Sequence, residues 1–285
     1  MESADNQHSL EIAVISLASA TARRARVREM LKESTLPWRI VDASSAEDRT
    51  LPYDEGRALI RHGSRLTAGE IGCFVSHYNC VREFALSSSS SKYLLVLEDD
   101  VWMDSSFEFS ILPKIMSRLG LDYLMLYSRQ IKNARFLGRI GVRSLFRFIS
   151  PPWGNQAYIV SKQGAEKMIN AIQRIDRPID DEFQMYWING LPTYALFPYP
   201  VIELNFASTL PKGYVERARF SPLQVLQRFT YRLVNKTRRA CAHFLLIWRD
   251  KKISDELKKK DLYIPVSDSL ELHPRSGTGR AEAQS

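Results

Sequence analysis

Short apolar segments of strand type alternate with charged segments of helical type over the first two-thirds of the chain. The strand-like segments lie at 11–17, 38–43, 93–100, 122–127 and 156–161, and the helical ones at 21–34, 67–86 and 162–172. This alternation favours an α/β fold in which helices cover a mostly parallel sheet. Residues 44–66 have neither pattern and are expected to form a loop.

The composition is that of an ordinary globular protein. Hydrophobic residues make up 45% of the chain and charged residues 25%, which disfavours disordered and fibrous classes. No run approaches the roughly 20 apolar residues that a membrane-spanning helix needs. Residues 1–10 have no signal-peptide pattern and are expected to be disordered, and three cysteines are too few for a disulfide framework. We therefore expect a reducing, cytoplasmic location.

Basic residues are concentrated near the C-terminus. From Lys212 to Lys260 there are 14 Lys/Arg and 4 Asp/Glu, a net of +10, whereas the whole chain carries +8. The remainder therefore sums to −2. Such a basic segment is expected to seek phosphates, either of nucleic acid or of anionic lipid. Residues 261–285 are expected to form a flexible tail.

The segment 211–260 also has the pattern of an amphipathic helix. Ser221, Pro222 and Gln224 form a helix start with a capping box. Helical spacing places six apolar residues on one face: Leu226, Phe229, Leu233, Ala240, Phe244 and Ile247. Four cations follow the neighbouring face: Arg228, Arg232, Lys236 and Arg239. This pattern is typical of helices that lie on an anionic membrane surface, although packing on the rest of the protein is the alternative.

Three adjacent carboxylates, Glu98-Asp99-Asp100, follow an apolar strand. In α/β sheets, ligands gather at the carboxyl ends of the strands. Carboxylates so close together repel one another unless a cation compensates, and Mg²⁺ or Mn²⁺ suits such a site. A divalent ion there could neutralise a leaving diphosphate. An acidic turn that merely closes a strand is the alternative.

Three further groups could carry chemistry. Asp180-Asp181-Glu182 suits a general base, although acidic residues also stabilise a first helical turn. The arginine pair 23–24 could bind a diphosphate. The simpler interpretation is that both arginines lie on a solvated helix face. A helix face carries Glu70, Cys73, His77 and Cys80, at a spacing that zinc could use. A buried helix with polar groups along a cleft explains that face better.

Five segments together resemble glycosyltransferase family 25, the transferases of lipopolysaccharide and lipooligosaccharide biosynthesis, and especially its β-galactosyltransferases. They are VISLASATARR (14–24), LTAGEIGCFVSHYNC (66–80), LLVLEDDV (94–101), WGNQAYIVSKQGAEKM (153–168) and RPIDDEF (177–183). The sequence departs from the family at residues 154–158, where Gly-Asn-Gln-Ala-Tyr replaces a pattern such as Gly-Thr-Ala-Gly-Tyr. That change leaves donor and acceptor preference open.

The resemblance implies a GT-A-like catalytic domain over residues 11–210, a UDP-sugar donor and a Mn²⁺ or Mg²⁺ ion. Asp100 would hold the metal, with Glu98 and Asp99 nearer the sugar and ribose. The nucleotide side would include Ile15, Ser16, Leu17, Arg24 and Asp42, with Ser76 and His77 beside the cleft. Asp180 would occupy the acidic position of the family.

The implied reaction transfers galactose from UDP-galactose with inversion to a β-linkage. Either Asp180 or Asp181 would take the acceptor proton. The acceptor would be the oligosaccharide of a bacterial glycolipid, reached by an enzyme peripheral on the inner membrane through its basic C-terminal helix. No nucleic-acid partner is expected, because no reading motif is present.

Several alternatives stay open at this stage. A glucosyltransferase of the same family would share every motif. A glycoside hydrolase also needs two carboxylates, but it does not explain an acidic triplet at a strand end. A nucleic-acid-binding protein would explain the basic segment, and a degenerate relative would bind sugar without transferring it.

Overall fold

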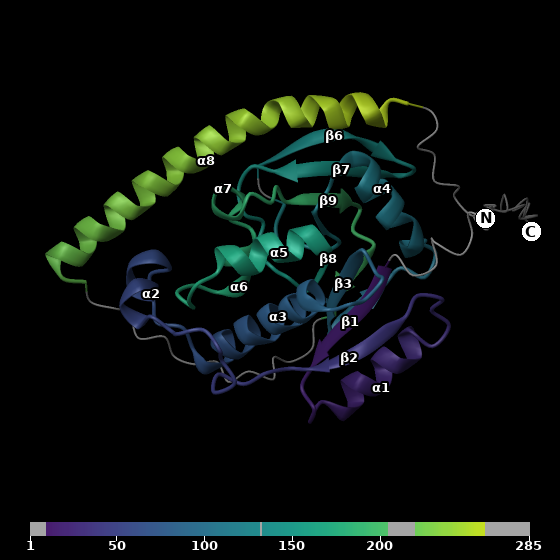
Figure 1. Cartoon of the computed structure of the whole chain (residues 1–285), viewed down its shortest axis with the longest axis horizontal. Helices are drawn as coiled ribbons and strands as arrows, with labels where there is room; N and C mark the ends of the chain where they lie inside the picture. The colour runs from purple at the N-terminus through teal and green to yellow at the C-terminus, as the bar shows by residue number, and fades with distance from the viewer. Residues whose placement is uncertain (1–9, 132, 205–219, 260–285) are drawn as a thin grey trace, which may run out of the picture.

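The computed structural model describes residues 10–131, 133–204 and 220–259 (Figure 1). The expected disordered start and the expected flexible tail at 261–285 lie outside the described residues, except that Leu10 opens the first strand. So do residues 205–219, which include the end of the expected catalytic domain and the beginning of the expected basic segment.

The main sheet has eight strands within the described ranges. They are β1 (Leu10–Ser16), β2 (Trp38–Asp42), β3 (Tyr93–Glu98), β5 (Tyr123–Met125), β6 (Ala134–Ile140), β7 (Arg143–Phe148), β8 (Ala157–Ser161) and β9 (Tyr194–Phe197). Their order across the sheet is β2-β1-β3-β8-β5-β9-β7-β6. A small second sheet pairs β4 (Val101–Met103) with β10 (Val201–Glu203).

The expectation of a mostly parallel sheet is wrong. The pairs β1·β2, β1·β3 and β5·β9 are parallel, whereas β3·β8, β5·β8, β7·β9 and β6·β7 are antiparallel. Strand direction depends on how the connections return to the sheet, and an apolar run such as that of β8 reads the same in either direction. The α/β architecture itself is confirmed.

Helices cover both faces of the sheet (Figure 1). On one face, α1 (Thr21–Met30) and α4 (Leu112–Leu119) pack on a core that includes Ile12 and Val14. On the other face, α3 (Ala68–Leu86) and α5 (Lys162–Ala171) pack on a core that includes Ala13 and Ile15. Alternate residues of β1 point to opposite faces, so both cores depend on the apolar run from Ile12 to Ile15.

Capping boxes begin both long helices, α3 and α8 (Pro222–Leu257), and the one expected at Ser221 is confirmed. At the start of α3, the Thr67 hydroxyl accepts from the Glu70 backbone N–H, and the Glu70 carboxylate accepts from the Thr67 N–H. Ser221 and Gln224 form the same motif at the start of α8. Each box satisfies backbone donors that have no partner in the first helical turn.

The expectation of an uninterrupted loop at 44–66 is wrong, because α2 (Glu55–Arg61) lies within it. This helix begins at Asp54, whose carboxylate accepts from a backbone N–H, and it buries a single residue, Ala58. Seven residues are too few to show an apolar period. The described part of the chain has three more short helices: η1 (Phe109–Ile111), α6 (Ile179–Phe183) and α7 (Tyr186–Asn189).

The 36-residue helix α8 lies along one side of the domain, beside α2, α7 and β6 (Figure 1). Its C-terminal half is anchored by Asp250, which accepts two hydrogen bonds of 2.7 Å from the guanidinium of Arg147. Both side chains are fully buried. Ile253, on the same face of the helix, is buried in the hydrophobic core. Within the described residues, no helix is long and apolar enough to cross a membrane.

Removal of Asp250 should destabilise the protein strongly. The Asp250→Ala variant leaves the buried Arg147 charge without its partner, and we expect a loss of about 3–5 kcal/mol in the free energy of unfolding. Denaturant titration measures this loss. Asp255→Asn, which removes an exposed carboxylate of the same helix, is the matched control and should leave the midpoint unchanged. A small loss for Asp250→Ala would mean that α8 does not depend on this ion pair.

Candidate active site

A cavity of about 450 Å³ opens at the carboxyl ends of β1 and β3. The parallel register places Ile15 beside Glu98, so the acidic triplet lies next to the turn that follows β1. Eight of the residues expected at the site line this cavity: Ile15, Ser16, Leu17, Ser76, His77, Glu98, Asp99 and Asp100. Segments that are far apart in sequence thus converge at one edge of the sheet.

Asp99 is held firmly in place. One of its carboxylate oxygens accepts from the Ser16 hydroxyl at 2.6 Å, and the other accepts from Arg23 at 3.0 Å. Arg26 donates to the Asp99 backbone carbonyl. These contacts tie the end of β3 to the beginning of α1, and they offset one of the three negative charges.

Asp100 is the carboxylate with the least compensation. Burial, followed by the negative charges of Glu98, Glu203 and Asp99, raises its pKa from the usual 3.8 to about 6. Among the described residues, its Oδ1 atom is buried without a hydrogen-bond partner. A buried acceptor in a negative environment suits a divalent cation.

Arg24 and Asp42, both expected on the nucleotide side, do not line the cavity. Arg24 donates to the carbonyl oxygens of Ser16 at 2.8 Å and Leu17 at 3.0 Å, and it pairs with Asp42. Arg24 therefore supports the turn after β1 through two of its carbonyl oxygens. Arg23, the other member of the arginine pair, does line the cavity.

The N-terminal half of α3 forms the opposite wall. Gly72 allows the loop after β2 to approach, because a Cβ atom there would lie 3.0 Å from the Ser44 carbonyl. The Ser76 hydroxyl accepts from the Ser44 N–H at 2.8 Å and donates to the Gly72 carbonyl at 2.7 Å. Ser76 therefore holds that loop against the helix.

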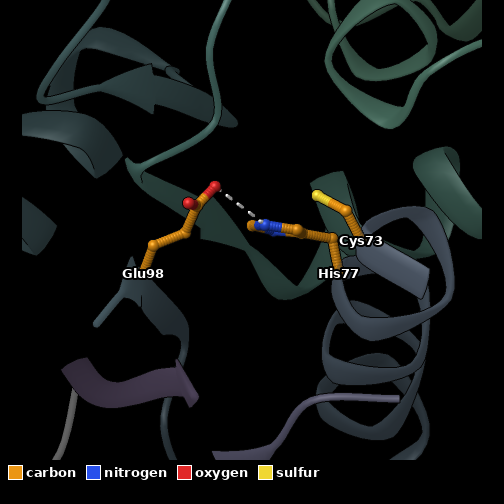
Figure 2. A group of neighbouring side chains, drawn as sticks. All are labelled: Cys73, His77 and Glu98. Atoms are coloured by element: carbon orange, nitrogen blue, oxygen red, sulfur yellow. Dashed lines mark ion pairs between the residues drawn. The ribbon is translucent and has the colours of Figure 1, made fainter. Parts of the chain in front are cut away.

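The helix face that was considered for zinc is not assembled as a unit. Glu70 is occupied by the capping box, and Cys80 is buried in the core. Cys73 and His77 instead turn toward Glu98 at the end of β3 (Figure 2). Burial raises the pKa of the Cys73 thiol well above its usual value, with the Glu98 charge as a second cause.

Asp180 and Asp181 occupy different environments. Asp180 is largely buried, and its carboxylate accepts from the backbone N–H of Gly154 at 3.2 Å and of Asp181 at 3.0 Å. Burial, followed by the charge of Asp181, raises its pKa. Asp181 lies 3.5 Å from His62. Neither lines the cavity, although the charge of Asp180 acts on Cys73, which does.

Sequence reasoning missed a second arginine of the cavity. Arg129 makes a bidentate ion pair with Glu203, at 2.7 Å and 3.2 Å, and the Tyr127 hydroxyl also donates to Glu203. Arg129 and Glu203 both line the cavity. No sequence motif predicts this ion pair, because Arg129 follows β5 and Glu203 ends β10, 74 positions later.

The ionised form of Asp100 should lower the unfolding free energy of the metal-free protein at pH values above the Asp100 pKa. Folding raises this pKa, so the folded state binds the proton more tightly, and that stabilisation is lost as the pH rises from about 4 through about 6. Asp100→Asn removes the penalty. We expect a gain of roughly 1–2 kcal/mol in unfolding free energy near pH 7, after allowance for solvent screening, and no gain near pH 4.

Urea titration in chelator measures the stability of the variant at both pH values. The exposed carboxylate of Asp42 provides a control, because Asp42→Asn should not reproduce the pH-dependent gain. If Asp100→Asn is no more stable than the wild type near pH 7, the acidic cluster is already compensated by the protein itself.

Comparison with known proteins gives two kinds of relative. Procollagen galactosyltransferase 1-B of Xenopus laevis is 28% identical over 240 residues, which is 75% of this chain and 38% of that protein. Inactive glycosyltransferase 25 family member 3 of Homo sapiens is 32% identical over 186 residues, 60% of this chain and 30% of that protein. This chain thus spans well under half the length of these relatives.

Among solved structures, a mutant of Drosophila β1,4-galactosyltransferase 7 in complex with manganese, UDP-Gal and xylobiose aligns over 77% of this chain and 79% of its own. Its identity to this chain is 9%, and the TM-score is 0.35. A likeness at that level assigns no function.

The family itself is identified from the sequence. The model of glycosyltransferase family 25, described as an LPS biosynthesis protein family, matches residues 9–183. This range contains the acidic triplet, the cavity wall formed by α3 and the Asp180-Asp181 pair. The mixed α/β sheet confirms the expected α/β fold class. The chain belongs to glycosyltransferase family 25.

Proposed function

We propose that this protein transfers a hexose from a nucleotide-sugar donor to a hydroxyl group of an oligosaccharide. One observation carries the proposal: the triplet Glu98-Asp99-Asp100 lies at the carboxyl end of a central strand, inside a cavity of about 450 Å³. This is the edge of an α/β sheet at which nucleotides bind. Membership of a glycosyltransferase family supports this assignment.

The charge of the cavity argues for a donor that arrives with a divalent cation. Two arginines, Arg23 and Arg129, face five carboxylates along its lining: Glu47, Glu98, Asp99, Asp100 and Glu203. A net charge of −3 would repel a bare diphosphate. The buried, unpartnered oxygen of Asp100 fits a Mn²⁺ or Mg²⁺ ion. When bound, such an ion neutralises charge on the leaving diphosphate.

The donor that we propose is UDP-galactose. The turn after β1, at Ile15-Ser16-Leu17, borders the cavity and would contact the nucleotide. Glu98 and Asp99 would lie nearer the sugar and ribose. Relatives named as galactosyltransferases support galactose over glucose. A glucosyltransferase of the same family remains the second candidate for the donor sugar.

We propose an inverting reaction that forms a β-linkage. One carboxylate takes the proton of the acceptor hydroxyl as the oxygen attacks the anomeric carbon, and the bond to UDP breaks on the opposite side. We take Asp180 rather than Asp181 as the base, because Asp180 is partly buried and accepts from the Gly154 N–H, whereas Asp181 lies beside His62. Positioning of donor and acceptor contributes much of the rate.

The acceptor that we propose is the oligosaccharide of a bacterial lipopolysaccharide or lipooligosaccharide, at the cytoplasmic face of the inner membrane. The outer face of α8 supports this location. On the inner side of α8, polar residues contact the rest of the domain. Arg228 donates to the Leu59 carbonyl, and Asn235 accepts from the Trp187 indole at 2.9 Å. Arg228 and Arg239, which contacts Trp187, therefore contribute to packing.

Most apolar residues of the expected stripe are exposed instead, although Ile247 is half-buried. Leu226, Phe229, Leu233 and Phe244 have exposed fractions of 58%, 63%, 54% and 74%. Trp248, at 72%, extends the stripe. Arg232 and Lys236 are also exposed, beside this stripe. An apolar stripe flanked by cations suits the headgroup region of an anionic membrane, where each cation contributes about 1 kcal/mol.

A donor screen tests the proposed reaction. The full chain with Mn²⁺ is incubated with UDP-galactose, UDP-glucose or the N-acetylated sugars and a short oligosaccharide acceptor. We expect transfer from UDP-galactose and its loss in chelator. Thermal stabilisation by UDP with Mn²⁺, without transfer from any donor, would favour a family member that binds and does not transfer, as the relatives named inactive suggest. Stabilisation by an oligonucleotide alone would favour a nucleic-acid-binding protein.

The base is distinguished by a pair of near-isosteric substitutions. Asp180→Asn should lower turnover by about 10²-fold or more, the usual contribution of a general base, with UDP binding retained. Asp181→Asn should keep near-native turnover. The amide oxygen that Asp180→Asn introduces can still accept one backbone hydrogen bond, so circular dichroism should be unchanged. Near-native turnover of both variants would reduce the acidic pair to a structural role.

Membrane association is tested by substitutions on the exposed stripe. Truncation of α8 would expose Arg147, so point substitutions are cleaner. We expect the triple variant Leu226→Gln, Phe229→Gln, Phe244→Gln to lose sedimentation with anionic liposomes, since the apolar face supplies the insertion. Transfer to a short soluble acceptor should persist. Leu86→Gln, which alters an exposed apolar residue outside α8, is the control. Unchanged liposome binding of the triple variant would contradict the proposal.

A further inference from the structure

We propose that Cys73, His77 and Glu98 form a binding site for a transition-metal ion such as zinc. This site is separate from the Mn²⁺ or Mg²⁺ site proposed at Asp100. The three side chains each offer one ligand atom, and these atoms all lie within 4.8 Å of one another. They come from two elements, α3 and the end of β3, and turn toward a common point (Figure 2).

The distances require only a small closure around an ion. His77 Nε2 lies 3.5 Å from a carboxylate oxygen of Glu98. Zinc holds nitrogen and oxygen at about 2.0–2.2 Å and sulfur at about 2.3 Å, so ligand atoms around it stand roughly 3.3–3.8 Å apart. Glu98 is 27% exposed and can rotate, whereas His77 is fixed in the core.

The hydrogen bond at the far side of the His77 ring suits metal binding. Its other ring nitrogen, Nδ1, lies 3.1 Å from the Tyr158 hydroxyl. Tyr158 is fully buried on β8. A histidine that binds a metal through one nitrogen is oriented by a hydrogen bond at the other. The ring is therefore held in position, with Nε2 directed at Glu98, before any ion arrives.

The donor types separate this site from the one at Asp100. A thiolate and an imidazole select Zn²⁺ or Co²⁺, whereas carboxylates alone suit Mg²⁺ or Mn²⁺. Three protein ligands leave a fourth position for water or an anion, as in catalytic zinc sites, which keep one coordination position open. All three residues line the cavity of about 450 Å³. The fourth ligand position therefore faces the space proposed for the nucleotide sugar. The bound ion displaces the thiol proton.

Cobalt spectroscopy tests the site directly. The full chain, freed of metal by chelator, is titrated with Co²⁺, and the near-ultraviolet band of a thiolate bound to cobalt is followed. We expect the band in the wild type and its displacement by Zn²⁺. It should disappear in Cys73→Ser and His77→Gln, and persist in Cys241→Ser, which alters the exposed cysteine.

Two further variants sharpen the test. Tyr158→Phe removes the hydrogen bond at Nδ1, and we expect about 10–100-fold weaker binding with the band retained. Asp100→Asn should retain the band, because Asp100 supplies no ligand atom to this site, which separates it from the proposed donor metal. Thermal unfolding of each metal-free variant checks that it folds. Absence of the band in the wild type, or its persistence in Cys73→Ser, would overturn the proposal, whatever the outcome of the donor screen.

Discussion

The mutual repulsion of Glu98, Asp99 and Asp100 is the constraint to which the site is adapted. Ser16 and Arg23 hold Asp99, and the Asp99 backbone accepts from Arg26. All three partners follow or end β1, so the parallel pairing of β1 with β3 is what brings them to the carboxylates. The Oδ1 atom of Asp100 receives no such contact within the described residues, and the raised pKa of Asp100 records the remaining cost.

This incomplete compensation is useful chemically. If the protein neutralised all three carboxylates, a cation would gain little by binding there. Under the proposed function, a site that is unfavourable when empty would become favourable when a divalent ion arrives with its diphosphate, so part of the folding stability would be exchanged for ligand binding. The loop at Gly154 is held in place by side chains from a distant segment. Its backbone has positive φ at Trp153 and Gly154, and Asp180 and Gln184 hold it through backbone N–H groups.

Apart from its C-terminal end, where Ile253 is buried in the core, helix α8 departs from the usual arrangement of an amphipathic helix. A surface helix normally buries its apolar stripe and exposes its polar face. Here the buried contacts of the helix include the Arg147–Asp250 ion pair and the Asn235–Trp187 hydrogen bond, while Phe229 and Phe244 face outward. The polar anchors fix which face is presented, because rotation of the helix would leave the buried Arg147 unpaired.

The sequence by itself determined the α/β class, the capped starts of α3 and α8, and the family. Strand apolarity, capping boxes and adjacent carboxylates are local patterns, and their physical causes act over a few residues. The tertiary structure decided what depends on distant pairs. It reversed β8 relative to β3, brought Arg129 to Glu203 and turned Cys73 and His77 toward Glu98. It also paired Arg24 with Asp42 outside the cavity lining, since packing and connection geometry, which no short segment encodes, set those contacts.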